Sequence, residues 1–348
     1  MADSEETTTP ETAKDDEPEP RSFFLGKKKE PKKNRRILRI LIFVVFILAI
    51  YDLSTAKLAT KYDLKQPRDP ETGILVGAEP RLLGPEDADT AILFVHGFVG
   101  GSNNFNDIPD LLAEKEGYRI KMMLLPGHGT SPKDFAETTA EEMLNAVLDE
   151  VNALKEKHKR VILVGHSMGG ALSTIVASTE ELDGLILAAP YYRVTHQWYY
   201  GLPVETWNAL TGPVILRVYK GDAFIRVAKK ENRPNILSYR WIPSKGSATL
   251  TAIGKQARDP ETLAAITEPT LVLHGRHDFA ASPKASKEAL DQMSSESKTY
   301  VDLHHSDHHI FWDYDHLHVY KAFVAFLNEL NADEARAEEL YEKVGIIE

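Results

Sequence analysis

The sequence predicts an α/β fold with a mostly parallel central sheet, helices on both faces and an inserted segment. From residue 75 onward, short β-branched runs alternate with helical stretches, a pattern typical of parallel strands joined by helices. Several of these runs are apolar throughout, as strands covered on both faces require. The alternation breaks at 191–260, which indicates an insertion into the fold.

The expected strands and helices follow one another along the chain. The runs that predict strands are 91–95, 119–126, 161–164, 185–189, 270–274 and 299–303. The stretches that predict helices are 104–116, 138–158, 168–179, 283–293 and 315–330, with a short amphipathic tail helix at 332–348. Residues 54–190 and 261–348 therefore form the expected core.

The insert 191–260 differs from this core in composition. It carries 11 Lys and Arg against 4 Asp and Glu, a formal charge of +7, in a chain of 348 residues with a net charge of −11. We expect it to form a lid over the carboxyl ends of the strands. Its aromatic residues Trp198, Tyr199, Trp207 and Trp241 are candidates to bind an acyl chain, because such pockets have mostly apolar walls.

The N-terminal residues form two further regions. Residues 1–36 are acidic and then basic, with few large apolar side chains, which predicts disorder. Residues 37–53 are nearly all apolar, with Arg39 and Asp52 close to their ends, and predict a transmembrane signal-anchor helix. There are two alternatives for residues 37–53. They could form a secretory signal that is cleaved near Ser54, or a buried or surface helix.

Charge and composition bear on location and chemistry. The 15 residues before Ile37 hold 7 Lys and Arg and the 15 after Leu53 hold 4, so we expect a single-pass protein with its N-terminus in the cytoplasm and its large domain across the membrane. The acidic balance argues against a nucleic-acid partner. The absence of cysteine excludes disulfides, cysteine-bound metal and a thiolate nucleophile.

Gly165-His-Ser167-Met-Gly169 follows an apolar strand and precedes a helix rich in small residues. A serine on such a tight turn projects its hydroxyl from the sheet, and the glycines permit the strained backbone. Ser167 is therefore the candidate nucleophile, with a helix-capping serine as the alternative. The N–H of Met168 and the N–H of Phe98, after the strand 91–95, are the candidate oxyanion donors.

Acid and base candidates follow the last two strands. Asp278 ends a polar turn after the strand 270–274, whereas Asp259 and Asp291 do not follow a strand. Two adjacent histidines follow the strand 299–303, and we favour His308 as the base over His309. The many histidines nearby raise the alternative of a metal site, but they lack carboxylates at a convincing spacing, and we expect neither metal nor cofactor.

The segments FVHGF, LLPGHG, GHSMGG, LHGRHD and SDHHIFWD occur in the order typical of a serine α/β-hydrolase. Over residues 88–330 the chain resembles the bacterial carboxylesterase and monoacylglycerol-lipase-like group, of the serine aminopeptidase S33 type. The resemblance implies an α/β-hydrolase fold, cofactor-free ester hydrolysis, Ser167 as nucleophile, Asp278 as acid, His308 as base, and Phe98 and Met168 as oxyanion donors. It aligns Ser306, His308 and Asp313; His309 and the N-terminal anchor depart from the family pattern.

These observations predict a membrane-anchored serine carboxylesterase or lipase that forms an acyl-enzyme on monoacylglycerol-like or lysophospholipid-like esters. We expect a single membrane contact, through residues 37–53, and a catalytic domain on the periplasmic side of a bacterial inner membrane. An amide or C–C bond hydrolase on the same fold is the alternative enzyme, although an aminopeptidase would need acidic residues to hold a substrate ammonium. A non-catalytic binding protein is the alternative from another class.

Overall fold

The computed structural model describes residues 32–343, and its contacts divide the chain into two compact units at Ile47 and Leu48. Most of the predicted disordered tail lies outside the described residues. Its last five residues belong to helix α1 (Lys32–Asp63), which is longer than the predicted span 37–53. Within the described residues, α1 is the one helix long and apolar enough to cross a membrane.

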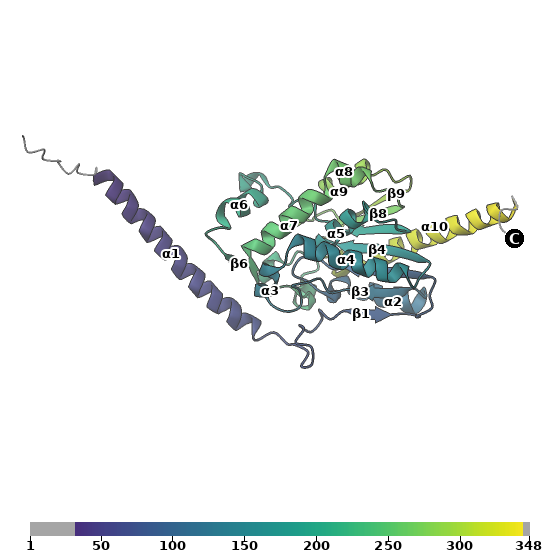
Figure 1. The fold of residues 1–348 in the computed structure, drawn as a ribbon, viewed down its shortest axis with the longest axis horizontal. Coiled ribbons are helices and arrows are strands. Elements are labelled where there is room, and N and C mark those ends of the chain that lie inside the picture. The colour runs from purple at the N-terminus through teal and green to yellow at the C-terminus, as the bar shows by residue number, and fades with distance from the viewer. Residues whose placement is uncertain (1–31, 344–348) are drawn as a thin grey trace, which may run out of the picture. The chain divides into compact units, whose positions relative to one another are not determined.

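A seven-stranded sheet forms the centre of the second unit (Figure 1). Its strand order is β1-β3-β2-β4-β5-β8-β9, and all neighbouring pairs are parallel except β1 with β3. The strands are β1 (Arg81–Leu83), β2 (Thr90–Val95), β3 (Arg119–Met122), β4 (Arg160–His166), β5 (Gly184–Ala188), β8 (Thr270–Gly275) and β9 (Lys298–Leu303). The predicted α/β-hydrolase fold class is confirmed, and the short antiparallel β1 is an addition to the predicted strands.

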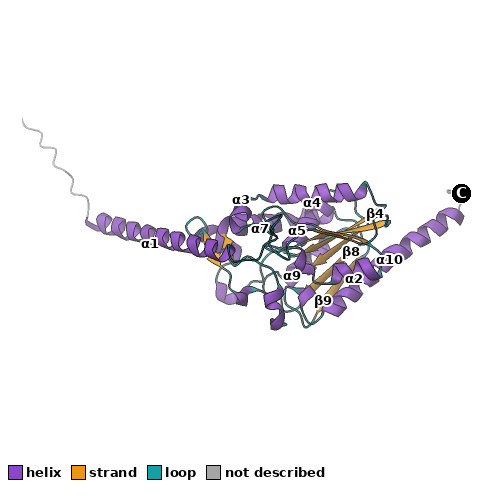
Figure 2. Ribbon diagram, turned by 90° about the horizontal axis from the view of Figure 1, so that it is seen from below, coloured by secondary structure: helices purple, strands orange, loops and turns teal. Residues whose placement is uncertain are grey.

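Helices cover both faces of this sheet (Figure 2). On one face pack α4 (Ala140–Lys155), α5 (Met168–Ala177), α7 (Ser244–Ala257) and α9 (Pro283–Gln292). On the other face pack α2 (Ile108–Lys115) and α10 (His316–Lys343). Because both faces are covered, β2, β4, β5 and β8 are buried almost along their whole length, which explains their apolar sequences.

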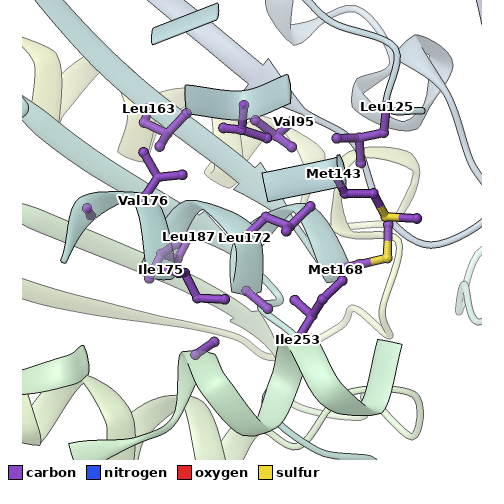
Figure 3. Packing of buried hydrophobic residues seen from close by; sticks show 14 of the residues in the cluster. Val95, Leu125, Met143, Leu163, Met168, Leu172, Ile175, Val176, Leu187 and Ile253 are labelled. Carbon is purple, nitrogen blue, oxygen red and sulfur yellow. The ribbon is translucent and has the colours of Figure 1, made fainter. Parts of the chain in front are cut away.

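Helix α5 is the most deeply buried helix, and this fixes the position of its first residue. All ten of its residues are buried. Figure 3 shows Leu172, Ile175 and Val176 of α5 packed with Leu163 and Leu187 of the sheet. Burying side chains of this kind contributes roughly 1.5–3 kcal/mol each, so the turn that joins β4 to α5 is held rigidly from both sides.

The insert 191–260 folds into short elements. They are the 3₁₀ turn η2 (Trp198–Tyr200), α6 (Val204–Thr211), β6 (Arg217–Tyr219), the 3₁₀ turns η3 (Asp222–Phe224) and η4 (Lys230–Asn235), β7 (Trp241–Pro243) and α7. Strands β6 and β7 pair antiparallel as a separate two-stranded sheet. The sequence predicted none of these elements individually, because no repeated polar–apolar period runs through the insert.

The remaining elements connect the core. They are the 3₁₀ turn η1 (Ser102–Phe105), α3 (Pro132–Glu137), α8 (Pro260–Ala264) and the 3₁₀ turn η5 (Ile310–Trp312). Helix α10 also differs from expectation. Helices were predicted at 315–330 and 332–348, whereas one continuous helix runs from His316 to Lys343, since neither proline nor glycine interrupts it.

Candidate active site

Ser167 lies in the turn between β4 and α5, with φ 55° and ψ −116°. This left-handed backbone is strained for a residue with a side chain and costs roughly 1–3 kcal/mol. Gly165 and Gly169 make the turn possible, because a Cβ on either would collide with a backbone carbonyl oxygen, that of Gly169 and that of Val95 respectively. The strain is therefore held by close packing of the backbone, and it presents the Ser167 hydroxyl at the carboxyl end of a central strand.

His308 follows β9 and contacts the other two predicted catalytic residues. Its Nε2 lies 2.8 Å from Ser167 Oγ, and its Nδ1 lies 2.7 Å from Asp278 Oδ2. A carboxylate can only accept, so Nδ1–H donates to Asp278, and in the neutral ring Nε2 accepts from the Ser167 hydroxyl. The three side chains therefore form one continuous hydrogen-bonded chain, although 141 residues separate Ser167 from His308.

Asp278 follows β8 and is almost fully buried. Its Oδ1 accepts the backbone N–H groups of Ala280 and Ala281. Burial raises the pKa of this carboxyl, but the neighbouring His308 and the hydrogen bonds from His274 and His308 outweigh it and hold the pKa well below its usual range. Asp278 is thus an ionised, fixed acceptor that orients the His308 ring.

His274, inside β8, is a partner of Asp278 that the sequence analysis did not single out. Its Nε2 lies 3.0 Å from Asp278 Oδ2, the oxygen that also accepts from His308. His274 is fully buried, and its Nδ1 has no partner in the part of the chain that the structure describes. Its position in the LHGRHD segment was the available signal, since a polar side chain inside a buried strand needs a polar partner.

Of the two predicted oxyanion donors, Met168 directly follows the serine in the chain and Phe98 belongs to a loop close to it. Within residues 32–343, the N–H groups of Phe98 and Met168 have no recorded backbone or side-chain acceptor, and Met168 opens α5, where an N–H has no partner in the helix. The loop that carries Phe98 is fixed by Asn104, whose Oδ1 accepts the Gly97 N–H at 3.1 Å. A Cβ on Gly97 would lie 3.0 Å from Ser167 Cβ, so this loop approaches the serine closely.

Other buried histidines surround these residues. Leu125 N–H donates to His96 Nε2, so the proton resides on Nδ1, and burial lowers the pKa of His96 to about 4. Burial likewise lowers the pKa of His128 to about 3 and of His166 to about 3. In the described part of the chain, no group of three or more histidine and carboxylate side chains could hold a metal ion.

His309, the alternative base, is placed differently from His308. Burial, followed by the charges of His166 and His308, lowers its pKa well below the usual value, and its Nδ1 lacks a partner among the described residues. Its backbone N–H donates to the Arg226 carbonyl oxygen. No hydrogen bond between the His309 ring and Ser167 is recorded, so the structure brings His308 to the serine.

A cavity of about 350 Å³ opens over Ser167. Its apolar walls come from Tyr191, Val194, Tyr200, Val204, Phe224, Leu250 and Phe279. None of the four aromatic residues expected to bind substrate lies in this lining. Trp198, Tyr199 and Trp207 are exposed, and Trp241 lines a different cavity. The insert does reach the site, but through residues that composition alone did not single out.

A larger cavity, of about 550 Å³, lies away from the serine. It is bounded by the last turns of α1, by α3 and by the β6–β7 ribbon, and it contains none of the predicted catalytic residues. Size alone therefore does not locate the active site. The smaller cavity is the candidate because Ser167, His308 and Phe98 all line it.

The arrangement is suited to acyl transfer, and the chain is also similar to known hydrolases. The family model described as serine aminopeptidase, S33, matches residues 86–315. A thermostable monoacylglycerol lipase of Bacillus sp. is 25% identical over 70% of this chain and 91% of its own length. A carboxylesterase of Bacillus subtilis is 22% identical over 72% of this chain and 98% of its own length.

A solved structure supports the fold independently. The monoacylglycerol lipase of Paleococcus ferrophilus superposes with a TM-score of 0.61 at 20% identity. The match covers 72% of this chain and 98% of that one. At this level of identity the likeness bears on the fold, and it extends over nearly the whole length of the other protein.

Proposed function

The chain belongs to the serine aminopeptidase S33 family of α/β-hydrolases, and from that premise we propose that it is a membrane-anchored serine esterase or lipase that works through an acyl-enzyme. It is an ester-hydrolysing enzyme of the esterase and lipase type. The observation that carries the proposal is the chain of hydrogen bonds from Ser167 through His308 to Asp278. The proposed substrates are monoacylglycerol-like or lysophospholipid-like esters.

The proposed reaction has two halves. His308 Nε2 takes the proton of Ser167 as Oγ bonds to the ester carbonyl carbon, and the N–H groups of Phe98 and Met168 stabilise the oxyanion. The ester C–O bond then breaks, and the imidazolium returns its proton to the leaving alcohol. In the second half His308 takes a proton from water, the resulting hydroxide attacks the acyl-enzyme, and the acid leaves as Ser167 regains its proton.

The alternative enzyme is an amide hydrolase, which the family description itself raises. An aminopeptidase holds the ammonium group of its substrate, and a carboxylate is the natural partner for that charge. Among the residues of the described chain that line the cavity there is neither Asp nor Glu, whereas Lys220 and Arg226 are present. This charge disfavours a cationic substrate and supports the ester proposal.

Membrane anchoring is proposed on separate grounds. The helical stretch Arg35–Asp63 is long and apolar enough to span a bilayer. The excess of Lys and Arg before residue 37 favours a cytoplasmic N-terminus and a catalytic unit on the periplasmic side. The insert 191–260, with its charge of +7, is proposed as the lid that meets the lipid substrate.

The proposal is tested by replacing Ser167 with alanine in the full-length protein. Ser167→Ala should abolish labelling by a fluorophosphonate probe and lower p-nitrophenyl butyrate hydrolysis by roughly 10⁶-fold, the loss typical of a removed nucleophile. Ser173→Ala is the matched control, because Ser173 is another buried serine, within α5, but lies outside the cavity lining. Labelling or turnover that persists in Ser167→Ala would contradict the proposal.

A further inference from the structure

The cavity over Ser167 carries positive charge without a matching negative group in its wall. Of the described residues that line it, Lys220 and Arg226 are cationic, and none is a carboxylate. Both cations come from the insert. An enzyme for purely neutral esters gains nothing from such charges, because bringing a cation into an apolar site costs desolvation energy.

The two cations differ in how they are compensated. Arg226 Nε lies 3.2 Å from Asp307 Oδ2, and its guanidinium stacks 4.7 Å from the centre of the Phe279 ring. Its charge is therefore balanced and its position fixed. Arg226 lines the cavity, but its charge already has a partner within the protein, the Asp307 carboxylate.

Lys220 has no such partner. Its Nζ donates to Ser238 Oγ at 3.1 Å, and in the described part of the chain no carboxylate lies within ion-pair distance of it. The nearby cation Arg240 is itself paired with Asp222. Burial and the charge of Arg240 lower the pKa of Lys220 to about 8, so the ammonium is present at neutral pH but poorly stabilised.

We propose that Lys220 binds an anionic oxygen group, a phosphate or a carboxylate, on the alcohol portion of the ester substrate. This inference rests on the proposed function and narrows it from acyl esters in general to anionic ones. An anionic group of the substrate would pair with the Lys220 ammonium, which has no carboxylate partner among the described residues. The hydrogen bond would be charge-assisted, and such bonds are roughly twice as strong as neutral ones.

The alcohol portion is chosen because of where the leaving group must lie. His308 returns the proton to the leaving alcohol, so that part of the substrate lies on the imidazole side of Ser167. Lys220 lines the same cavity as His308 and its neighbour His309, so the ammonium lies in the cavity that also holds the imidazole. The acyl chain then occupies the apolar remainder of the cavity.

The test compares esters that share one acyl chain and differ in the charged group on the alcohol portion. The substrates are 1-octanoylglycerol, its 3-phosphate and the octanoyl ester of glycerate, each below its aggregation limit, with the full-length enzyme in neutral detergent. We expect kcat/KM to be higher for the phosphate or the carboxylate ester than for the neutral one. The two anionic arms show which group is the preferred ligand, and either preference supports the proposal.

Lys220→Gln removes the charge and keeps much of the side-chain length. It should lower the ratio of kcat/KM for an anionic ester to kcat/KM for the neutral ester by about 10-fold or more. The effect should lie mainly in KM, because the variant loses a hydrogen bond to a charged group of the substrate. Lys255→Gln is the matched control. Lys255 is an exposed lysine of the same insert, on α7 and outside the cavity, so the ratio should not change.

The pH dependence gives a second readout that a structural role would not move. A lysine whose pKa is about 8 is charged below that pH and neutral above it, so the ratio should fall as the pH rises through 8. Phosphate and carboxylate stay fully ionised over this range. The other groups near Lys220 are the guanidinium groups of Arg240 and of Arg226, which lines the same cavity, and His309, whose pKa is lowered well below its usual value, so that it stays neutral. In Lys220→Arg the ratio should therefore remain high at pH 9.

Two kinds of failure are distinguishable. If Ser167 is labelled and the neutral ester is hydrolysed, but the anionic esters are not preferred or Lys220→Gln leaves the ratio unchanged, the assignment of Lys220 is overturned and the esterase stands. If Ser167 is not labelled and no ester is turned over, the proposed function fails, and this inference fails with it.

Discussion

The catalytic edge of the sheet and the insert that borders it are built in opposite ways. Ser167, Asp278 and His308 are 6%, 2% and 7% exposed and are joined by hydrogen bonds. In the insert, Trp198 is 86% exposed and Phe224 is 63% exposed. The difference indicates that the core holds these three side chains in fixed positions, whereas the insert leaves large aromatic side chains exposed, as a surface that binds a partner does.

The largest expected effect separates two adjacent histidines of the rigid region. His308→Ala should lower kcat for p-nitrophenyl butyrate by roughly 10⁴–10⁶-fold, because Ser167 loses its base. His309→Leu, which keeps a side chain of similar size, should lower kcat by less than about tenfold, since no hydrogen bond from its ring to Ser167 is recorded. Steady-state kinetics decide between them, and the reverse ranking would reassign the base to His309.

A smaller loss is expected from Asp278→Asn. The amide can donate to His308 and favour the wrong ring tautomer, so kcat should fall by roughly 10⁴-fold. Asp291→Asn, a change of the same chemistry on an exposed residue of α9, is the control and should retain activity. Equal activity in the two variants would show that Asp278 does not orient the imidazole.

Asp278 also makes the stability of the fold depend on pH. Its pKa in the folded state is lowered, so the stabilisation it provides is present above the unfolded pKa, near 4, and is lost as the pH falls toward the folded value. Thermal unfolding of the wild type between pH 6 and pH 2 should therefore show a steeper fall in Tm than that of Asp278→Asn. Parallel curves for the two proteins would contradict an ionised Asp278.

The sequence predicted the parts of the site that depend on local geometry. Ser167 was predicted because a strand, two glycines and a helix start lie within a few residues. Asp278 was predicted because it ends a polar turn after a strand, and His308 because it follows the last strand in the order Ser, Asp, His of α/β-hydrolases. The parallel strands β5, β8 and β9 bring both residues to one edge of the sheet. Choosing His308 over His309 required the motif spacing, and the hydrogen bonds of His308 now support that choice physically.

Two parts of the site were not predicted. His274 lies only four residues before Asp278, and it was missed because the sequence does not show that the turn after β8 brings the two side chains within 3.0 Å. The insert was known to be aromatic and basic, but which of its residues face the serine depends on how β6 and β7 pair. Lys220 follows β6 directly and lines the cavity, whereas the more conspicuous Trp198 does not. Composition showed that the insert is aromatic and basic, but only the fold shows which of its residues line the cavity.

The smallest expected effect concerns the contact between strand β6 of the insert and the last turns of α1. Arg217 of β6 donates through Nη1 to the Asp52 carboxylate and to its carbonyl oxygen, both at 2.7 Å. Tyr51, also on α1, donates its hydroxyl to the Arg217 carbonyl oxygen at 3.2 Å. The part of α1 after Leu48 therefore holds the strand that precedes Lys220. The two charged side chains are 24% and 29% exposed, so solvent weakens but does not abolish their attraction.

A double-mutant cycle of Asp52→Asn and Arg217→Gln measures this contact. We expect a coupling free energy of about 0.5–1 kcal/mol and a shift in Tm of about 1–3 °C for each single change. The pair Arg193 and Glu288, on the same insert and α9 but 45% and 47% exposed, is the control and should couple less. Equal coupling in both cycles would show that Asp52 contributes no more than an ordinary surface charge. Coupling confined to Asp52 and Arg217 would show that the end of α1 after Leu48 supports the strand that precedes Lys220.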